Sequence, residues 1–134
     1  MALENIQFLG HVSDSQRATL MAQAKAVIVA ALEDYGLVPI ESNFSGTPVV
    51  SFGAGGVLDT QVPGKTGVFF HRQSPDALHT ALNKASQISW DTAAIRDHAR
   101  TRFTEAAFFR QVEQVVDTVL GRATPLPRWV LALM

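Results

Sequence analysis

Two glutamates eight positions apart, Glu33 and Glu41, enclose the polar stretch EDYGLVPIE in an otherwise apolar part of the sequence. The stretch follows AVIVAAL, residues 26–32, a β-branched apolar run that predicts a strand buried in the interior of a sheet. In open α/β sheets ligands bind outside the carboxyl ends of the strands, so Glu33, Asp34 and Tyr35 should line a crevice. Carboxylates there can accept charge-assisted hydrogen bonds from hydroxyl groups. The spacing therefore predicts a site for a hydroxyl-bearing ligand.

The same stretch predicts a helix whose amino terminus points toward that ligand. Gly36 allows close approach of the backbone, and a helix that begins near Leu37 has unpaired N–H groups at its start. The positive end of the helix dipole suits a phosphate. We expect Glu41, in the first turn of this helix, to accept hydrogen bonds from sugar hydroxyls. A nucleotide-sugar combines a phosphate with flanking hydroxyl groups, and it is the ligand class that we predict.

The elements that must position this site alternate short apolar runs with longer amphipathic segments, which is typical of a parallel sheet with crossover helices. Ser13 and Gln16 form a capping box for a helix that extends to about residue 25. We predict an α/β fold with a Rossmann-like parallel sheet of about four strands and flanking helices. The strands are expected at residues 6–10, 26–32, 47–52 and 67–70, and the later helices at residues 38–45, 74–85, 91–103 and 105–120.

Composition narrows the function classes. The length of 134 residues suits one domain, since domains typically contain roughly 100 to 150 residues. A net charge of −1 argues against nucleic acid as a partner and against an anionic membrane surface. The absence of cysteine excludes disulfides and thiolate metal sites, and the four histidines lack metal-ligand spacing, so we predict no metal and no cofactor. The glycines of residues 53–56 lack the spacing of a phosphate-binding loop and predict a tight turn or close packing.

The segment from EDYG to GVFF, together with FLGHVSD upstream, resembles the signature region of retaining GT-B glycosyltransferases of family 4. Glu33 and Glu41 match the E-x7-E motif of that family, and the resemblance covers about residues 6–82. It implies a nucleotide-sugar donor site in the C-terminal Rossmann-like domain of a GT-B enzyme. Glu33 would be the catalytic residue at the donor sugar, and Glu41 would bind the ribose. The other donor-binding residues implied are Asp34, Tyr35, Gly36 and Leu37 near the sugar and diphosphate, and Gly10, His11 and Val12 near the base.

The sequence departs from the family pattern at several positions. Asp34 stands where the family usually has glycine, and the resulting EDYG resembles a branch often assigned to mannosyl transfer, which favours GDP-mannose as the donor. Family members also carry an N-terminal acceptor domain and two βα units before FLG, the first of which brings basic residues to the diphosphate. We therefore expect residues 1–122 to be part of a C-terminal donor-binding domain, with a tail at residues 123–134. The strand at residues 6–10 would then close the sheet by pairing directly beside the strand at residues 26–32, or exposed edges would pair between copies in a homo-oligomer.

Three functions stay open from the sequence. The first is the donor-binding portion of a retaining, metal-independent glycosyltransferase of glycan or polysaccharide synthesis, inactive without its acceptor domain. The second is a non-catalytic nucleotide-sugar-binding or assembly module, and the third is a sugar-nucleotide epimerase of the same architecture. We expect a cytoplasmic location, with the full-length enzyme peripheral at the membrane.

Overall fold

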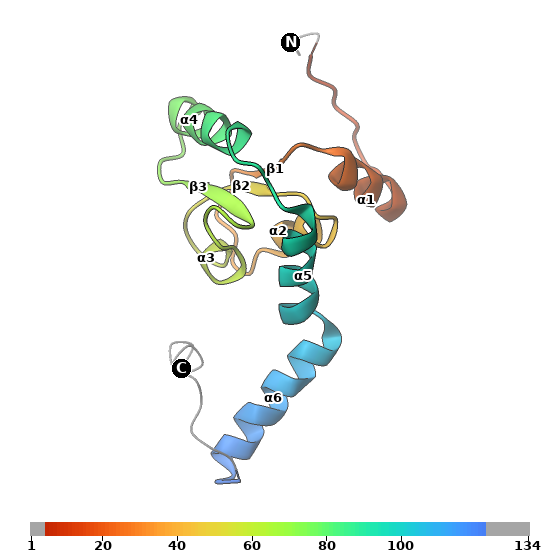
Figure 1. Cartoon of the computed structure of the whole chain (residues 1–134), viewed down its shortest axis with the longest axis vertical. Helices are drawn as coiled ribbons and strands as arrows, with labels where there is room; N and C mark the ends of the chain where they lie inside the picture. The colour runs from red at the N-terminus through yellow and green to blue at the C-terminus, as the bar shows by residue number, and fades with distance from the viewer. Residues whose placement is uncertain (1–4, 123–134) are drawn as a thin grey trace. The chain divides into compact units, whose positions relative to one another are not determined.

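The computed structural model describes residues 5–122 (Figure 1). Its contacts divide the chain into two units, residues 1–98 and residues 99–134, and each is described by itself. The predicted tail at residues 123–134 lies outside the described residues. No helix within the described part of the chain is both long and apolar enough to span a bilayer.

The first unit is built on a parallel sheet of three strands, β1 (Val27–Val29), β2 (Val49–Phe52) and β3 (Gly67–Phe70), in the order β1-β2-β3. In register, Ile28 pairs with Val50, and Val50 pairs with Val68. The central strand β2 begins with three fully buried residues, as expected for a strand with a neighbour on each side and helices on both faces. The predicted α/β class with a parallel sheet is confirmed.

The strand predicted at residues 6–10 is wrong. These residues adopt no regular structure, all are exposed, and Phe8 is 84% exposed. A segment becomes a strand only where it finds a hydrogen-bonding neighbour and a face to bury, and the apolar letters IQFLG do not supply either. The proposed closure of the sheet by this segment beside β1 is therefore wrong as well. Pairing of sheet edges between copies stays a prediction.

β1 is consequently an edge strand, whereas the sequence predicted it to lie in the sheet interior. Ile28 is 49% exposed, although its register partners Val50 and Val68 are buried. The difference arises because no described strand pairs with the free side of β1. Part of its apolar surface therefore stays exposed to solvent.

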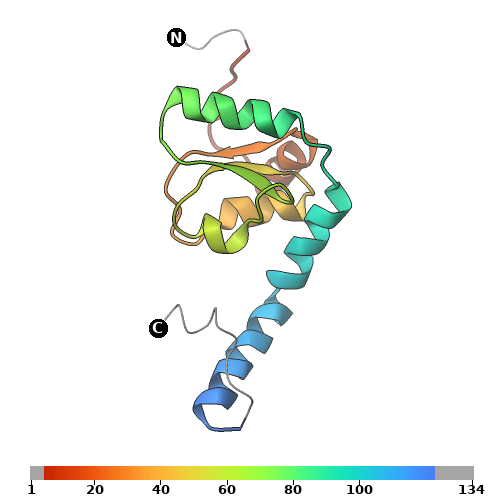
Figure 2. The same ribbon diagram turned by 60° about the vertical axis from the view of Figure 1, so that its left-hand side comes forward.

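Helices cover both faces of the sheet (Figure 2). Helix α4 (Pro75–Ser86) lies on one face and α2 (Leu37–Phe44) and the short α3 (Val57–Thr60) on the other. The sequence did not predict α3, which has only four residues. The core under α4 joins alternate strand residues to the alanines of the helix, and it consists of Val50, Val68, Phe70, Ala81 and Ala85.

The helix ends agree with the capping and stop residues predicted from the sequence. Ser13 and Gln16 form the predicted capping box at the start of α1 (Asp14–Gln23). Ser74 caps α4 with Pro75 at its first position. Gly46 follows α2 with a φ of +82°, a left-handed conformation that glycine adopts without strain.

The remaining helices are α5 (Thr92–Arg102), which crosses the division between the units, and α6 (Glu105–Val119), which lies in the second unit. Thr104 caps α6, and Gly121 follows its end with a φ of +67°. From the sequence we expect Phe108 and Phe109 to lie in a core rather than to stack on a base. This expectation is wrong, because both are more than half exposed. They form part of an apolar stripe on α6 that also includes Val112, Val116 and Val119.

Candidate functional site

The loop that follows β1 is held against the glycine-rich segment after β2. Glu33 forms a parallel bridge with Gly55, and the amide of Gly56 donates to the Glu33 carbonyl at 2.7 Å. A Cβ atom at residue 56 would lie 2.5 Å from the α-carbon and the carbonyl carbon of Tyr35, closer than Cβ atoms approach such atoms in proteins. The glycines of this segment therefore serve close backbone packing, as the sequence predicted, and they fix the path of the loop that carries Glu33.

The loop after β1 leads directly into the amino terminus of α2. Gly36 is the N-cap residue with φ of +89°, and no side chain among residues 5–122 caps the helix. The amides of Leu37 and Val38 donate to no group in the described part of the chain, and Pro39 has no N–H. The helix thus begins with free backbone donors at the positive end of its dipole, an arrangement that suits an anion.

The predicted residues around this terminus face outward. Asp34 is exposed, Tyr35 is 59% exposed, and Leu37 is exposed on the first turn of α2. Glu33 is half-buried. The structure therefore brings Glu33 to Leu37 together at the carboxyl edge of the sheet, where the sequence placed them.

Glu41 lies one turn deeper than predicted. It is the fifth residue of α2, in the second turn rather than the first, and its side chain is 39% exposed. The Nη1 atom of Arg17 in α1 lies 3.3 Å from Glu41 Oε2, and Arg17 Nη2 donates to Asp14 Oδ1 at 3.2 Å. Glu41 Oε2 is shielded from solvent yet accepts no properly directed hydrogen bond, so its contact with Arg17 is an ion pair only. Arg17 cannot be identified from the sequence, because an ion pair between two helices leaves no local signal.

The segment predicted to lie near a base, residues 10–12, precedes α1. Gly10 and His11 are exposed, Val12 is half-buried, and Gly10 has φ of +63°. No hydrogen bond or ion pair within residues 5–122 joins these three residues to the loop at residues 33–37. They immediately precede the N-cap of α1. The ion pair between Arg17 and Glu41 is one of the contacts between this helix and α2.

A buried polar network anchors the other end of α2. Asn43 donates to the carbonyls of Thr47 at 3.2 Å and Thr66 at 3.4 Å, and its Oδ1 accepts from Gln61 Nε2 at 2.8 Å. Thr66 Oγ1 donates to Gln61 Oε1 at 3.0 Å and accepts from the amide of Val62 at 2.8 Å. The network joins α2 to the turn before β3 and so fixes the direction in which the amino terminus of α2 points.

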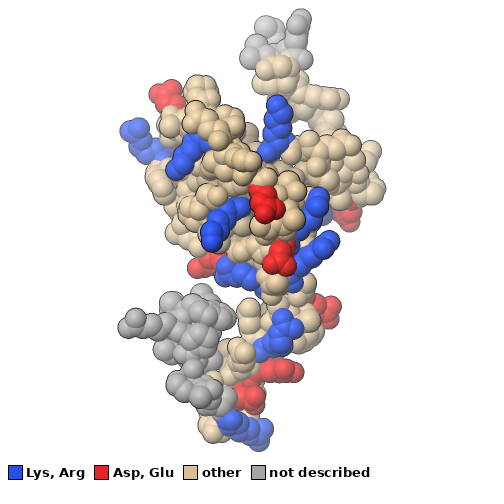
Figure 3. Space-filling view, in the orientation of Figure 1, with Lys and Arg blue, Asp and Glu red and all other residues tan. Residues whose placement is uncertain are grey.

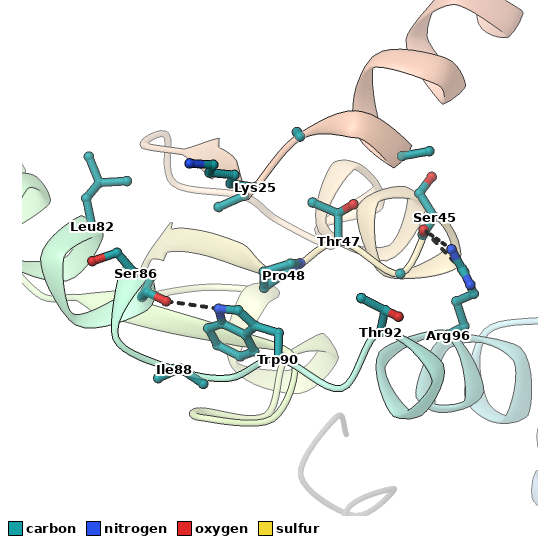
Figure 4. Close-up of a pocket in the computed structure, with 15 residues that line it drawn as sticks. Lys25, Ser45, Thr47, Pro48, Leu82, Ser86, Ile88, Trp90, Thr92 and Arg96 are labelled. Atoms are coloured by element: carbon teal, nitrogen blue, oxygen red, sulfur yellow. Dashed lines mark hydrogen bonds between the residues drawn. The ribbon is translucent and has the colours of Figure 1, made fainter.

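A pocket of about 640 Å³ lies at the opposite end of the sheet (Figure 4). It includes Lys25, Trp90 and Arg96 but none of the residues predicted to bind a donor. Its polar groups are partly used within the fold: Arg96 donates to the Ser45 carbonyl at 3.0 and 3.3 Å, and Trp90 Nε1 donates to the Ala85 carbonyl at 3.0 Å. The pocket is therefore not the predicted donor site, although it is large enough to hold a small ligand.

The face of the molecule drawn in Figure 3 carries charges of both signs. On the face drawn in Figure 3, Lys and Arg side chains alternate with Asp and Glu side chains. Within the described residues, no group of three or more His, Asp or Glu side chains is arranged to hold a metal ion.

Comparison with known proteins identifies the family. Residues 1–107 match the family model of glycosyl transferases group 1. The chain belongs to this family. It is 27% identical over 122 residues to the alpha-1,3/1,6-mannosyltransferase ALG2 of Dictyostelium discoideum, covering 90% of this chain and 29% of the relative. It is 34% identical over 126 residues to a D-inositol 3-phosphate glycosyltransferase of Corynebacterium aurimucosum, covering 90% of this chain and 30% of the relative.

A solved structure agrees on the fold. Sucrose-phosphate synthase from Thermosynechococcus elongatus superposes with a TM-score of 0.72 at 24% identity, over 87% of this chain and 31% of that one. The group 1 chain described here thus spans less than a third of the length of these relatives. The family model confirms the predicted glycosyltransferase class at the level of group 1. The solved structure confirms the α/β fold.

Proposed function

We propose that this chain is the donor-binding portion of a retaining glycosyltransferase of family 4, which transfers a sugar from a nucleotide-diphosphate sugar to an acceptor. The observation that carries the proposal is the free amino terminus of α2, flanked by Glu33 before it and Glu41 within it. Free amides suit the diphosphate, and carboxylates suit the hydroxyls on either side of it. Membership in glycosyl transferases group 1 supports sugar transfer as the reaction class.

Each predicted residue takes a role in this proposal. Glu33 is the catalytic residue beside the donor sugar, and Asp34, Tyr35, Gly36 and Leu37 contact the sugar and diphosphate. Glu41 accepts from the ribose, and Gly10, His11 and Val12 lie toward the base. GDP-mannose is the favoured donor, which accords with a mannosyltransferase among the relatives, and the setting is glycan or polysaccharide synthesis.

The rest of the transferase is proposed to come from outside these 134 residues. An acceptor domain and basic residues for the diphosphate would complete the site, and the short span relative to the known proteins supports this. Electrostatic stabilisation of the diphosphate leaving group would then supply most of the rate enhancement, without a metal, while the acceptor hydroxyl attacks from the same face. We expect no transfer by this chain alone, a cytoplasmic location, and peripheral membrane attachment of the full-length enzyme.

A calorimetric titration tests the donor site directly. GDP, UDP, ADP and GDP-mannose are titrated into the wild-type chain and into Glu41→Ala. We expect saturable binding of one nucleotide and a loss of about ten-fold or more in affinity in the variant, because a charge-assisted hydrogen bond is removed. Asp76→Ala is the matched control, since Asp76 is an exposed carboxylate in the first turn of α4. If wild type and Glu41→Ala bind the nucleotide with equal affinity, Glu41 does not bind the ribose.

A non-catalytic assembly module is the second candidate, and the free edge of β1 favours it. An edge strand with a half-exposed isoleucine can pair with another chain. Sedimentation velocity distinguishes the two: a stable dimer that binds none of the four nucleotides supports the module, and a nucleotide-binding monomer argues against it.

A further inference from the structure

The two carboxylate oxygens of Glu41 occupy different surroundings. Oε2 is shielded from solvent and lies 3.3 Å from Arg17 Nη1, but no residue in the described part of the chain donates a hydrogen bond to it. No described residue donates to Oε1, and the side chain keeps 39% of its surface exposed. A ligand that approaches Glu41 therefore meets Oε1, while the guanidinium covers Oε2.

Arg17 is itself held by a second carboxylate. Its Nη2 atom bonds Asp14 at 3.2 Å one turn earlier on α1, so the guanidinium spans Asp14 and Glu41. Arginine suits this placement because its planar, permanently charged head has donors on both terminal nitrogens. The bridge restrains the Glu41 side chain and also joins α1, which follows residues 10–12, to α2.

We propose that Arg17 is a positioning residue for nucleotide recognition: it holds Glu41 with Oε1 directed at a ribose hydroxyl. The inference rests on the proposed donor site and adds a residue to it. Arg17 touches Glu41 and need not touch the nucleotide. Its contribution therefore exists only for ligands that use the Glu41 carboxylate, which separates a positioning role from a general effect on folding.

The experiment compares GDP with 2′,3′-dideoxy-GDP, which lacks both ribose hydroxyls. Calorimetry is performed on wild type, Arg17→Leu, Glu41→Gln and the double variant. We expect Arg17→Leu to bind GDP about five-fold more weakly and 2′,3′-dideoxy-GDP with unchanged affinity. In the Glu41→Gln background the same substitution should have little further effect, because the carboxylate that Arg17 positions is gone.

Two further variants sharpen the test. Arg17→Lys keeps a charge near Glu41 and should recover part of the lost GDP affinity, whereas Asp14→Asn removes only the second partner of Arg17 and should change it less than two-fold. Urea denaturation of Arg17→Leu checks that the variant is folded, and we expect near wild-type stability, since exposed ion pairs contribute little.

The outcomes separate this inference from the donor-site proposal. If Glu41→Gln weakens GDP binding but Arg17→Leu does not, only the role of Arg17 is overturned. Equal weakening of GDP and 2′,3′-dideoxy-GDP by Arg17→Leu also overturns it, because the effect is then unrelated to the ribose hydroxyls. If wild type binds the two ligands equally, or binds none of GDP, UDP, ADP and GDP-mannose, the ribose site itself is refuted, and the inference falls with it.

Discussion

The two ends of the three-stranded sheet differ in the volume and in the unpaired polar groups that a ligand would meet. At the amino end lies a pocket of about 640 Å³, but Arg96 and Trp90 already bond to backbone carbonyls of the fold. At the carboxyl end the surface is open, yet no described residue accepts from the first two amides of α2 or donates to Glu41 Oε1. The carboxyl end is the better candidate, because unsatisfied donors and acceptors indicate a ligand more directly than empty volume does.

The difference follows from the direction of parallel strands. Helices that follow such strands begin at the carboxyl edge and present N–H groups there, whereas the amino edge receives helix ends and their turns. In this chain, Gly36 opens α2 at the carboxyl edge, and Ser45 and Gly46 close it at the amino edge. If the comparison is right, substitutions at the carboxyl end should change ligand binding, and those at the amino end should change stability alone.

The largest effect is expected at Gly56, which supports the loop of the carboxyl end. In Gly56→Ala the new Cβ would lie 2.5 Å from two Tyr35 backbone atoms, so the loop or the glycine segment must move. We expect destabilisation of about 3 kcal/mol in urea denaturation, comparable to severe overpacking, and loss of nucleotide binding.

Gly64→Ala is the control for glycine replacement. Gly64 has φ of +76° but nothing within 4 Å of an added Cβ, so only backbone strain of about 1 to 2 kcal/mol is expected. Nucleotide affinity should be kept. A Gly56→Ala variant as stable as Gly64→Ala would show that the loop after β1 is not held by this packing.

A smaller effect is expected at Asn43, which anchors α2 away from the ligand. Asn43→Ala removes donors to two carbonyls and leaves Gln61 Nε2 without its Asn43 acceptor. Loss of partners from buried polar groups should cost about 2 kcal/mol in urea denaturation. Asn83→Ala, at an exposed position of α4, should change stability by less than about 0.5 kcal/mol. Equal stabilities of the two variants would argue against a stabilising role for the network.

Much of this arrangement could be predicted from the sequence because its signals are local. Caps at Ser13 and Ser74, the stop at Gly46 and the buried runs of β2 and β3 each depend on neighbouring residues. The same holds for the position of Glu33 after β1, since the end of a strand is visible in the sequence.

What could not be predicted depends on partners distant in the chain. Residues 6–10 have the apolar pattern of a strand but pair with no described strand, so β1 stays at the border of the described sheet. The Arg17 contact to Glu41 joins residues on different helices, and a four-residue helix such as α3 has too few positions to show a period. Such features arise from tertiary packing, which a single sequence does not encode in its spacing.

The smallest effect is expected at the amino end. Arg96→Ala removes two donors from the Ser45 carbonyl, but the arginine is exposed, and water can replace it. We expect a loss of about 1 kcal/mol in urea denaturation and no change in the affinity for GDP, because Ser45 lies at the far end of α2 from the free amides. Arg72→Ala, also exposed but in the loop after β3, serves as the matched arginine control. Weaker GDP binding by Arg96→Ala, with the affinity of Arg72→Ala unchanged, would show that the ligand contacts the pocket. The amino end of the sheet would then be the better candidate for the site.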